Sequence, residues 1–449
     1  MTGADSRTLE QRFAAQGFIK LLRDLERRPL EDLVRYQARR LEELARHARA
    51  WSPFYKDRLA PAFDRDDHID FARWNDVPIL TRADAQANGK ALAAEMIPAK
   101  VGNYIEDQTS GSGGSAFHFL KSAAALVAES GNSLRIYLDH RFDADATYAD
   151  IRLDLTGTAI YPDGEEREDW SHGEGSGRHF LLDINTPTDQ QIEFLIRHKV
   201  RILFTWASNA RQIALRLEET GQRLDLANLG TSAEFCTEAT REDCLRVFGT
   251  APVDVFGVRE LGIVAFPCHA APVYHFTAES GFFEAIADDG RPASPGEPGR
   301  LVGTSLYSYH MPFIRYATGD YVTLADGRCA CGRSLPTVTA IHGRDRNRFR
   351  RRNGSLAFPD IPERAFDAIF GAMDWQLVQT GKGRCAFRVT GDRRPAGQDG
   401  FDALRDLVGK AVGEPVVLSI VEAAKPAPPR RKREKFIRET DSGPASAAD

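Results

Sequence analysis

Lysine and cysteine are scarce in this sequence of 449 residues. Lysine supplies 11 of the 59 basic residues, and arginine supplies the other 48. Six cysteines are too few for a disulfide scaffold in so long a chain, so we expect the reducing cytoplasm as its location. No run of about 18 apolar residues occurs, which argues against a membrane span. The first residues lack the basic-then-apolar order of a secretory signal, and we expect none.

Composition and charge narrow the class of protein further. Hydrophobic residues make up 42% of the chain and charged residues 27%, which excludes disorder of the whole chain. The net charge of −5 disfavours dedicated nucleic-acid binding through a global positive field. At about 150 residues per domain, the length predicts two or three domains.

The order of expected elements predicts an α/β fold in two unequal parts. Helices and strands alternate over residues 189–256, which is typical of a layered sheet covered by helices. The pattern of residues 273–324 predicts only strands and turns, which indicates an antiparallel β-barrel-like part or sheet attached to the α/β part. A break at residues 343–347 follows. After it, expected helices and strands alternate again and form a small α+β unit. We therefore predict a large N-terminal domain over 1–343, a small mobile lid domain over 344–440 and a disordered tail over 441–449.

A loop rich in glycine and hydroxyl groups follows an expected strand at residues 104–109. Its backbone N–H groups and hydroxyls could hold phosphates, because glycine allows a close backbone approach. The residues concerned are Thr109, Ser110, Gly111, Ser112 and Gly114. The glycine spacing fits neither the Walker nor the Rossmann pattern. A flexible surface turn is the alternative interpretation.

Four charged residues stand where a nucleotide site could use them. Glu234 and Glu260 each follow an expected sheet strand, at the edge where open α/β sheets bind ligands. Asp320 follows a glycine turn and could accept two hydrogen bonds from a ribose diol. Lys435 lies in a basic segment near the chain end. Taken singly, each is as well explained as a solvated loop or tail residue.

The order of these motifs resembles the adenylate-forming acyl ligase superfamily. The resemblance is to the phenylacetate–CoA ligase and capsule-enzyme-like branch, which includes coenzyme F390 synthetase-like proteins. Its most specific part is the segment from Phe313 to Asp320, and the segment Cys329 to Pro336, which leads to Gly343-Arg344, resembles that branch in particular. The similarity covers about residues 104–438.

The resemblance implies a two-step reaction. A carboxylate attacks the α-phosphate of ATP to give acyl-AMP and pyrophosphate, and a nucleophile, most often coenzyme A, then takes the acyl group. By the pattern of the family, Glu260 would bind Mg²⁺, Asp320 the ribose, and Lys435 the carboxylate and α-phosphate. The other nucleotide contacts would come from Thr109, Ser110, Gly111, Ser112, Gly114, Ala233, Glu234, Phe256, Gly257 and Arg344.

Three residues depart from the family pattern. Gly113 replaces a usual threonine in the phosphate loop, and Glu434 replaces a usual glycine before Lys435. Arg259 stands where a serine or threonine is usual before the metal-binding glutamate. A guanidinium at this position could act in catalysis by holding the α-phosphate, or could mark an altered phosphate site.

Cys268, His275, Cys329 and Cys331 could form a structural zinc site. Three thiolates and one imidazole are a usual zinc ligand set, although the Cys-x-Cys pair is tighter than the common spacing. Relatives in the branch share a Cys/His arrangement here, which favours zinc. Free thiols in a turn are the alternative.

The sequence leaves several choices open. The acyl acceptor could be coenzyme A or an amine, or AMP itself could be transferred to an acceptor. The carboxylic acid is not identified, and neither is the oligomeric state, a dimer included. The arginines of 344–352 raise a rival of another class, a metal-stabilised nucleic-acid-binding protein, which the net charge disfavours. We expect no membrane partner.

Overall fold

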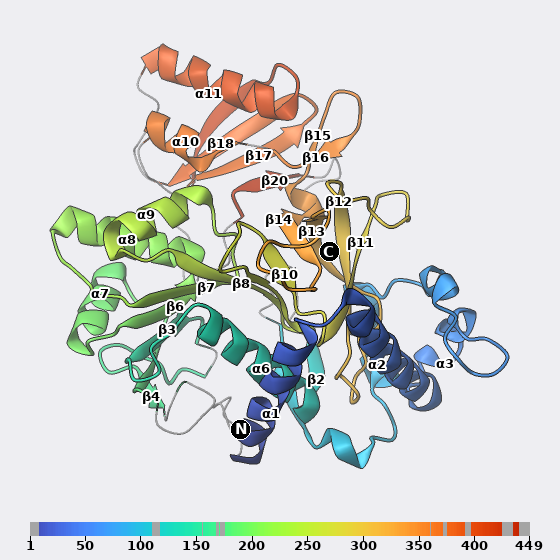
Figure 1. Cartoon of the computed structure of the whole chain (residues 1–449). Helices are drawn as coiled ribbons and strands as arrows, with labels where there is room; N and C mark the ends of the chain where they lie inside the picture. The colour runs from blue at the N-terminus through green and yellow to red at the C-terminus, as the bar shows by residue number, and fades with distance from the viewer. Residues whose placement is uncertain are drawn as a thin grey trace.

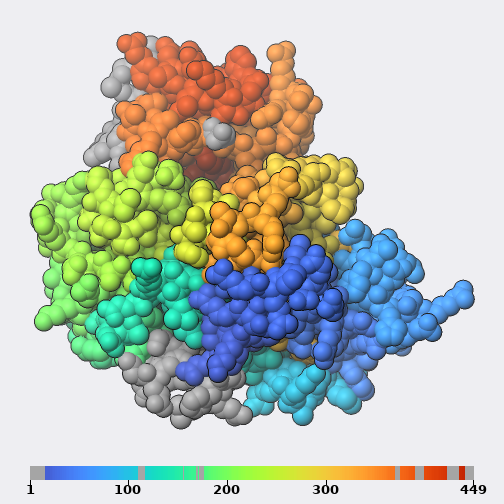
Figure 2. Space-filling model, in the orientation of Figure 1, coloured from blue at the N-terminus to red at the C-terminus, as the bar shows by residue number. Residues whose placement is uncertain are grey.

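The chain folds into a large part and a smaller C-terminal lobe (Figure 1). The computed structural model describes residues 9–109, 117–154, 156–167, 170, 176–359, 361–370, 375–390, 397–423 and 434–439. Figure 2 shows the C-terminal lobe, in orange and red, resting on the rest of the molecule. No helix in these ranges is long and apolar enough to cross a bilayer.

A parallel layer forms one half of the large part, as the alternation in sequence predicts. Strands β3, β5, β6, β7 and β8 are parallel neighbours, in the order β5-β3-β6-β7-β8, and β4 closes the edge in the antiparallel sense. The strands are β3 (Tyr148–Arg152), β4 (Glu165–Arg167), β5 (His179–Asp183), β6 (Ile202–Trp206), β7 (Asn228–Ser232) and β8 (Pro252–Val258). The helices between them are α7 (Thr188–Arg197), α8 (Ala207–Thr220) and α9 (Glu238–Phe248). Apolar faces of these helices and strands form a common core, for example Ile192 and Leu203.

The antiparallel half continues the same sheet. Strand β8 is parallel to β7 on one side and antiparallel to β9 on the other, so twelve strands form one sheet rather than a separate barrel. The added strands are β9 (Gly262–Pro267), β10 (Tyr274–Phe276), β11 (Gly281–Ile286), β12 (Pro298–Ser305), β13 (Tyr316–Leu324) and β14 (Thr337–Arg344). The switch of direction occurs at the turn that contains Glu260, which places this residue at the junction of both halves.

N-terminal helices cover the antiparallel half. These are α1 (Leu9–Leu25), α2 (Leu30–Trp51), α3 (Tyr55–Arg58), α4 (Arg82–Ala87), α5 (Gly89–Leu92) and α6 (Ala123–Asp139), with short 3₁₀ turns at Ala60–Ala62, Phe71–Asp76 and Ala99–Val101. Leu33, Leu41 and Leu44 recur at helical spacing on α2 and are buried. A separate hairpin of β1 (Tyr104–Gln108) and β2 (His118–Ser122) flanks the loop rich in glycine.

The C-terminal lobe is a small α+β unit, as the sequence indicates. Its four-stranded sheet has the order β19-β18-β17-β20, with α10 and α11 packed on it. The elements are a 3₁₀ turn (Asp345–Asn347), β15 (Phe349–Arg350), β16 (Leu356–Ala357), α10 (Glu363–Phe370), β17 (Trp375–Gly381), β18 (Arg384–Thr390), α11 (Gly397–Val412), β19 (Val417–Ala423) and β20 (Phe436–Arg438). Phe366, Trp375 and Phe387 stack on one another at the centre of its core.

Candidate nucleotide and metal sites

Glu260 is a buried carboxylate at the turn between β8 and β9. Only 5% of the residue is exposed, and its Oε1 accepts a hydrogen bond of 2.8 Å from the hydroxyl of Tyr316 on β13. Burial and the Glu260 charge raise the pKa of Tyr316 well above its ordinary value, so the hydroxyl keeps its proton. The contact joins the turn that carries Glu260 to the segment that carries Asp320.

Arg82 links Glu260 to the loop rich in glycine, and sequence reasoning missed it. Its Nη1 lies 3.7 Å from Oε1 of Glu260, and its Nη2 donates to Oγ1 of Thr109 over 2.6 Å. Leu80 pairs with Arg315 and Ala317 through backbone hydrogen bonds of 2.9 Å, which brings the start of α4 beside β13. No sequence signal reveals this role, because the pairing joins segments more than 230 residues apart.

Thr109 marks the end of the described chain before the loop. Its Oγ1 also accepts the backbone N–H of Phe117 over 3.1 Å, which ties the two ends of the loop together. Ser110, Gly111, Ser112 and Gly114 lie outside the described residues. Their contacts with a phosphate therefore stay a prediction.

Arg259 forms an ion pair with Asp107 of β1. The arginine side chain is 57% exposed, whereas that of Asp107 is 12% exposed. The ion pair thus joins the β8–β9 turn, which carries Arg259, to the β1–β2 hairpin, which carries Asp107. Asp107 is a further residue that the sequence patterns did not single out.

Asp320 and Arg344 face each other as paired residues of β13 and β14. Gly319 has a φ of +85°, a conformation that glycine adopts without strain, and the amide of Asp320 donates to Thr318 Oγ1 over 3.1 Å. Gly343 has a steric role as well, because an added Cβ would lie 2.2 Å from Oδ1 of Asn347. That oxygen accepts the backbone N–H of Arg344, which fixes the end of β14.

Ala233 and Glu234, two further residues predicted for the nucleotide site, follow the parallel strand β7. Ala233 has a φ of +72°, and the next residue, Glu234, accepts the backbone N–H of Ser208 over 3.1 Å at the start of α8. Phe256 and Gly257 lie on the adjacent β8, so these positions share one edge of the sheet. An added Cβ at Gly257 would approach the carbonyl oxygen of Gly262 to 3.2 Å, which favours glycine.

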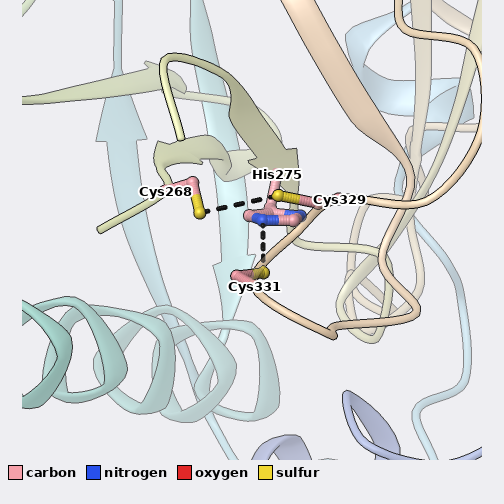
Figure 3. A group of neighbouring side chains, drawn as sticks. All are labelled: Cys268, His275, Cys329 and Cys331. Atoms are coloured by element: carbon pink, nitrogen blue, oxygen red, sulfur yellow. Dashed lines mark hydrogen bonds between the residues drawn. The ribbon is translucent and has the colours of Figure 1, made fainter. Parts of the chain in front are cut away.

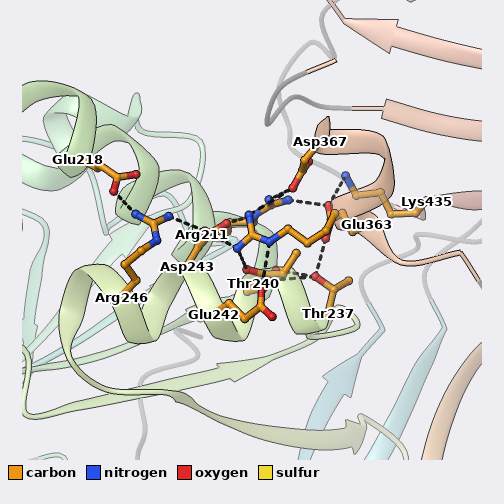
Figure 4. Close-up of polar contacts among 12 residues, drawn as sticks. Arg211, Glu218, Thr237, Thr240, Glu242, Asp243, Arg246, Glu363, Asp367 and Lys435 are labelled. Atoms are coloured by element: carbon orange, nitrogen blue, oxygen red, sulfur yellow. Dashed lines mark hydrogen bonds and ion pairs between the residues drawn. The ribbon is translucent and has the colours of Figure 1, made fainter. Parts of the chain in front are cut away.

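Lys435 lies at the start of β20 and contacts groups of the small lobe. Its Nζ is 3.2 Å from Oε1 of Glu363 (Figure 4). The same atom lies 4.7 Å from the ring centroid of Trp375. Burial acts to raise the pKa of Glu363, but the charges of Lys435 and Arg211 outweigh it, so the pKa lies below its ordinary value. Both of these partners of Lys435 belong to the small lobe. The predicted bridge to the α-phosphate would require the lobe to move.

Glu363 also takes part in a cluster between the two parts of the chain (Figure 4). We call this the interdomain cluster; it comprises Arg211, Thr237 and Asp243 of the large part and Glu363, Arg364 and Asp367 of α10. Arg211 is 6% exposed, and its guanidinium pairs with three carboxylates. Because these carboxylates come from both parts, the cluster fixes the orientation of the lobe.

A second set of ion pairs joins β20 to the expected hinge. Arg346 forms two bonds of 2.8 Å with the carboxylate of Glu434, and Arg438 pairs with Asp345 over 2.7 Å. Arg348 pairs with Asp288 over 2.6 Å. Glu434, the residue that replaces the usual glycine, therefore has a partner of opposite charge. These pairs occupy arginines on which the nucleic-acid alternative depended.

Cys268, His275, Cys329 and Cys331 come together as the sequence predicts (Figure 3). Their ligand atoms all lie within 4.8 Å of one another, with 3.7 Å between the sulfurs of Cys268 and Cys329 and 3.3 Å between Cys331 Sγ and His275 Nε2. Two thiolates bound to one tetrahedral zinc at about 2.3 Å would be about 3.7 Å apart. The donor set and its spacing therefore fit a zinc ion.

The protonation of the cluster is set by burial. Burial raises the pKa of Cys268 to about 11 and lowers that of His275 to about 4, so the imidazole is neutral at pH 7. Burial also acts to raise the pKa of Cys331, but the Arg333 backbone N–H and the neighbouring thiols lower it below its ordinary value. Metal binding requires a neutral imidazole and deprotonated thiols, so the pKa shifts of His275 and Cys331 act in its favour and that of Cys268 acts against it.

Comparison with known proteins supports the family. No family model matches the chain. A phenylacetate–coenzyme A ligase of Thermus thermophilus is 27% identical over 35% of this chain, and the match spans only 37% of that relative's length. A fumarate–(S)-2,3-diaminopropanoate ligase of Enterobacter agglomerans is 24% identical over 69% of this chain and 75% of its own length.

Solved structures extend the similarity to the whole fold. A 2-hydroxyisobutyryl-CoA ligase in the postadenylation state aligns with a TM-score of 0.70 at 17% identity, over 98% of this chain and 94% of that chain. An open conformation of that ligase with 2-HIB-AMP and CoA aligns with a TM-score of 0.59 at 17% identity, over 89% of this chain and 90% of that chain. By sequence the chain is similar to these ligases and by fold to 2-hydroxyisobutyryl-CoA ligase, which supports its resemblance to the adenylate-forming acyl ligase superfamily in the phenylacetate–CoA ligase-like branch.

Proposed function

We propose that the protein activates a carboxylic acid with ATP, forming acyl-AMP and pyrophosphate, and transfers the acyl group to coenzyme A. The observation that carries this proposal is the junction of Glu260, Tyr316, Arg82 and Thr109, which connects three sequence motifs of the family in one place. The phenylacetate–CoA ligase named among the relatives supports coenzyme A as the acceptor.

The chemical difficulty of the first step is charge, because an anionic acid must approach a polyanion. Arg82 and Arg259 would place positive charge on two sides of the phosphates, and the N–H groups and hydroxyls of 109–114 would bind the pyrophosphate end. Asp320 would hold the ribose, and Ala233, Glu234, Phe256 and Gly257 would surround the adenine. Mg²⁺ held by Glu260 would supply charge neutralisation at the phosphates.

Lys435 would complete the site only after the lobe rotates, with a hinge near residues 343–347 as the boundary between the domains. The interdomain cluster supports this proposal, since it offers a set of ion pairs that a rotation can break and remake. Closure over the nucleotide would exclude water from the acyl-adenylate.

An amine is a second acceptor class with specific support. The relative that matches the largest share of this chain among the sequence relatives reported above is a ligase that joins fumarate to diaminopropanoate. Transfer of AMP itself shares the first step but has no relative in its favour here.

We further propose zinc at Cys268, His275, Cys329 and Cys331, and a cytoplasmic location in which these thiols stay reduced. The zinc would have a structural role, because four protein ligands leave no open coordination position.

The test is pyrophosphate release from ATP and Mg²⁺ over a panel of acids, followed by mass detection of the product with coenzyme A or with amines. Acid-dependent pyrophosphate and an acyl-CoA product are expected. An amide product without thioester would favour the amine alternative, and the absence of acid-dependent pyrophosphate would refute adenylation.

A further inference from the structure

A pocket opens directly beside Glu260, between α6 and the β8–β9 turn. In the proposed reaction Glu260 lies at the metal and the phosphates, so the attacking carboxylate must enter from a space adjoining this residue. This pocket is one such space in the described part of the chain. Its polar walls are Lys121, Glu129, Asn132, Ser280, Ser305 and Ser308.

Lys121 and Glu129 form an ion pair on the wall of this pocket. Lys121 on β2 has a side chain only 8% exposed, and its Nζ lies 2.5 Å from Oε2 of Glu129 on α6. Gly262 adjoins the carboxylate, and an added Cβ would make an ordinary contact of 3.7 Å with Cδ and Oε2 of Glu129. The Glu129 side chain is 34% exposed, so the pair is only partly buried, and such a pair contributes little net stability. Its position on a pocket wall therefore points to recognition of a ligand.

The remaining polar groups of the wall are held in place by hydrogen bonds. Asn132 is 1% exposed and donates to Ser280 Oγ over 2.7 Å, while Ser308 Oγ donates to Ser305 Oγ over 3.0 Å. Because Ser280 accepts from Asn132, its own proton is available to a ligand. Ala125, Ala128, Leu261, Ile263 and Tyr307 also line the pocket, so it offers both apolar and polar groups to a ligand.

The ion pair sets the kind of group that it can bind. The pair is neutral overall, so an ammonium group or a second carboxylate would be attracted by one partner and repelled by the other, with no net gain to offset the loss of its hydration. A neutral group that both accepts and donates can take a hydrogen bond from the ammonium and give one to the carboxylate. We propose that the acid activated by this protein carries such a group, a hydroxyl or a carboxamide, bound between Lys121 and Glu129. This proposal rests on the proposed adenylation.

The experiment compares matched acids by the kcat/KM of pyrophosphate release. The pairs are 3-hydroxybutanoate with butanoate, 4-hydroxyphenylacetate with phenylacetate, and succinamate with succinate. The acid with the neutral polar group should be preferred by about 10- to 100-fold in at least one pair, the range for a hydrogen bond to a charged group.

Two variants test the assignment to the ion pair. Lys121→Met and Glu129→Gln should each reduce the preference toward one, while Lys100→Met, at an exposed lysine, should keep it. Equilibrium binding of ATP to each variant reports whether the protein is folded and the nucleotide site intact.

The outcomes separate the two proposals. If ATP binds and hydrocarbon acids, diacids or amino acids are used as well as the neutral polar ones, the substrate class is wrong and adenylation stands. An unchanged preference in both folded variants would remove the ion pair from recognition. If no acid on the panel or among amino acids and fatty acids releases pyrophosphate, the proposed function fails and the substrate proposal with it.

Discussion

The hydrogen bond from Tyr316 to Glu260 offers a sharp test of how the nucleotide site is built. Replacing Tyr316 by Phe removes one hydroxyl and leaves the packing of the ring. Tyr316 is 2% and Glu260 5% exposed, so water cannot readily replace the lost donor. A hydrogen bond to a charged group contributes about 1.5–3 kcal/mol, and we take about 2 kcal/mol for this one.

Two measured effects follow from that magnitude. If Glu260 must keep its orientation in the transition state, about 2 kcal/mol corresponds to a loss of about 30-fold in kcat/KM for pyrophosphate release. In a large domain each kcal/mol shifts the melting temperature by about 2 °C, so the variant should melt about 4 °C lower. The assay is acid-dependent pyrophosphate release over a range of Mg²⁺ concentrations, together with a calorimetric melting curve.

Tyr309 provides a matched control. It is also buried, at 3% exposed, but its hydroxyl has no hydrogen-bond partner among the described residues. Tyr309→Phe should therefore keep activity and should not lower stability. Equal effects of the two substitutions, or wild-type activity and stability in Tyr316→Phe, would refute the role given to the Tyr316–Glu260 contact.

Three further predictions concern the lobe and the metal. Lys435→Ala should abolish adenylation but largely spare thioester formation from supplied acyl-AMP. The control Lys410→Ala should leave both half-reactions unchanged. Equal loss of both half-reactions in Lys435→Ala would point away from Lys435 as the bridging cation. Arg211→Met should destabilise the observed orientation of the lobe, by about 3 kcal/mol as for a broken buried ion pair, and increase cleavage by protease near the hinge; an unchanged cleavage pattern would contradict that role. Metal analysis should find about one zinc per chain, lost in Cys331→Ser and kept in Cys385→Ser, and a folded, active, metal-free preparation would disprove the zinc site.

Much of the fold could be predicted from the sequence because local patterns decide it. The helix–strand alternation predicted over residues 189–256 is present, with the helix Ala207–Thr220 directly after the strand Ile202–Trp206. Thr81 forms the N-cap of the helix that follows it, with a capping box to Asp84. The sequence pattern did not predict that the antiparallel strands continue the parallel sheet. That continuity depends on β8, which pairs with β7 on one side and with β9 on the other.

The site was predictable only where motifs carry it. Glu260 was singled out because it follows a strand within the ordered motifs, and its role stays a prediction. The four Cys/His residues were singled out because they are a usual zinc ligand set, and the structure brings them together. Arg82, Asp107 and Lys121 were missed, since single charged residues on short elements give no signal of the distant partner that they meet. Lys435 was assigned to the nucleotide, but in this conformation it contacts Glu363, a pairing set by the orientation of the lobe.

The most direct test of the central claim is exchange of labelled pyrophosphate into ATP, measured with the acid panel for the wild-type protein and for Glu260→Ala and Asp320→Ala. The account predicts exchange that depends on both acid and Mg²⁺ in the wild-type protein, with a severe loss in each variant. Absence of exchange from a folded wild-type protein that binds ATP, or near-normal exchange in both variants, would contradict it.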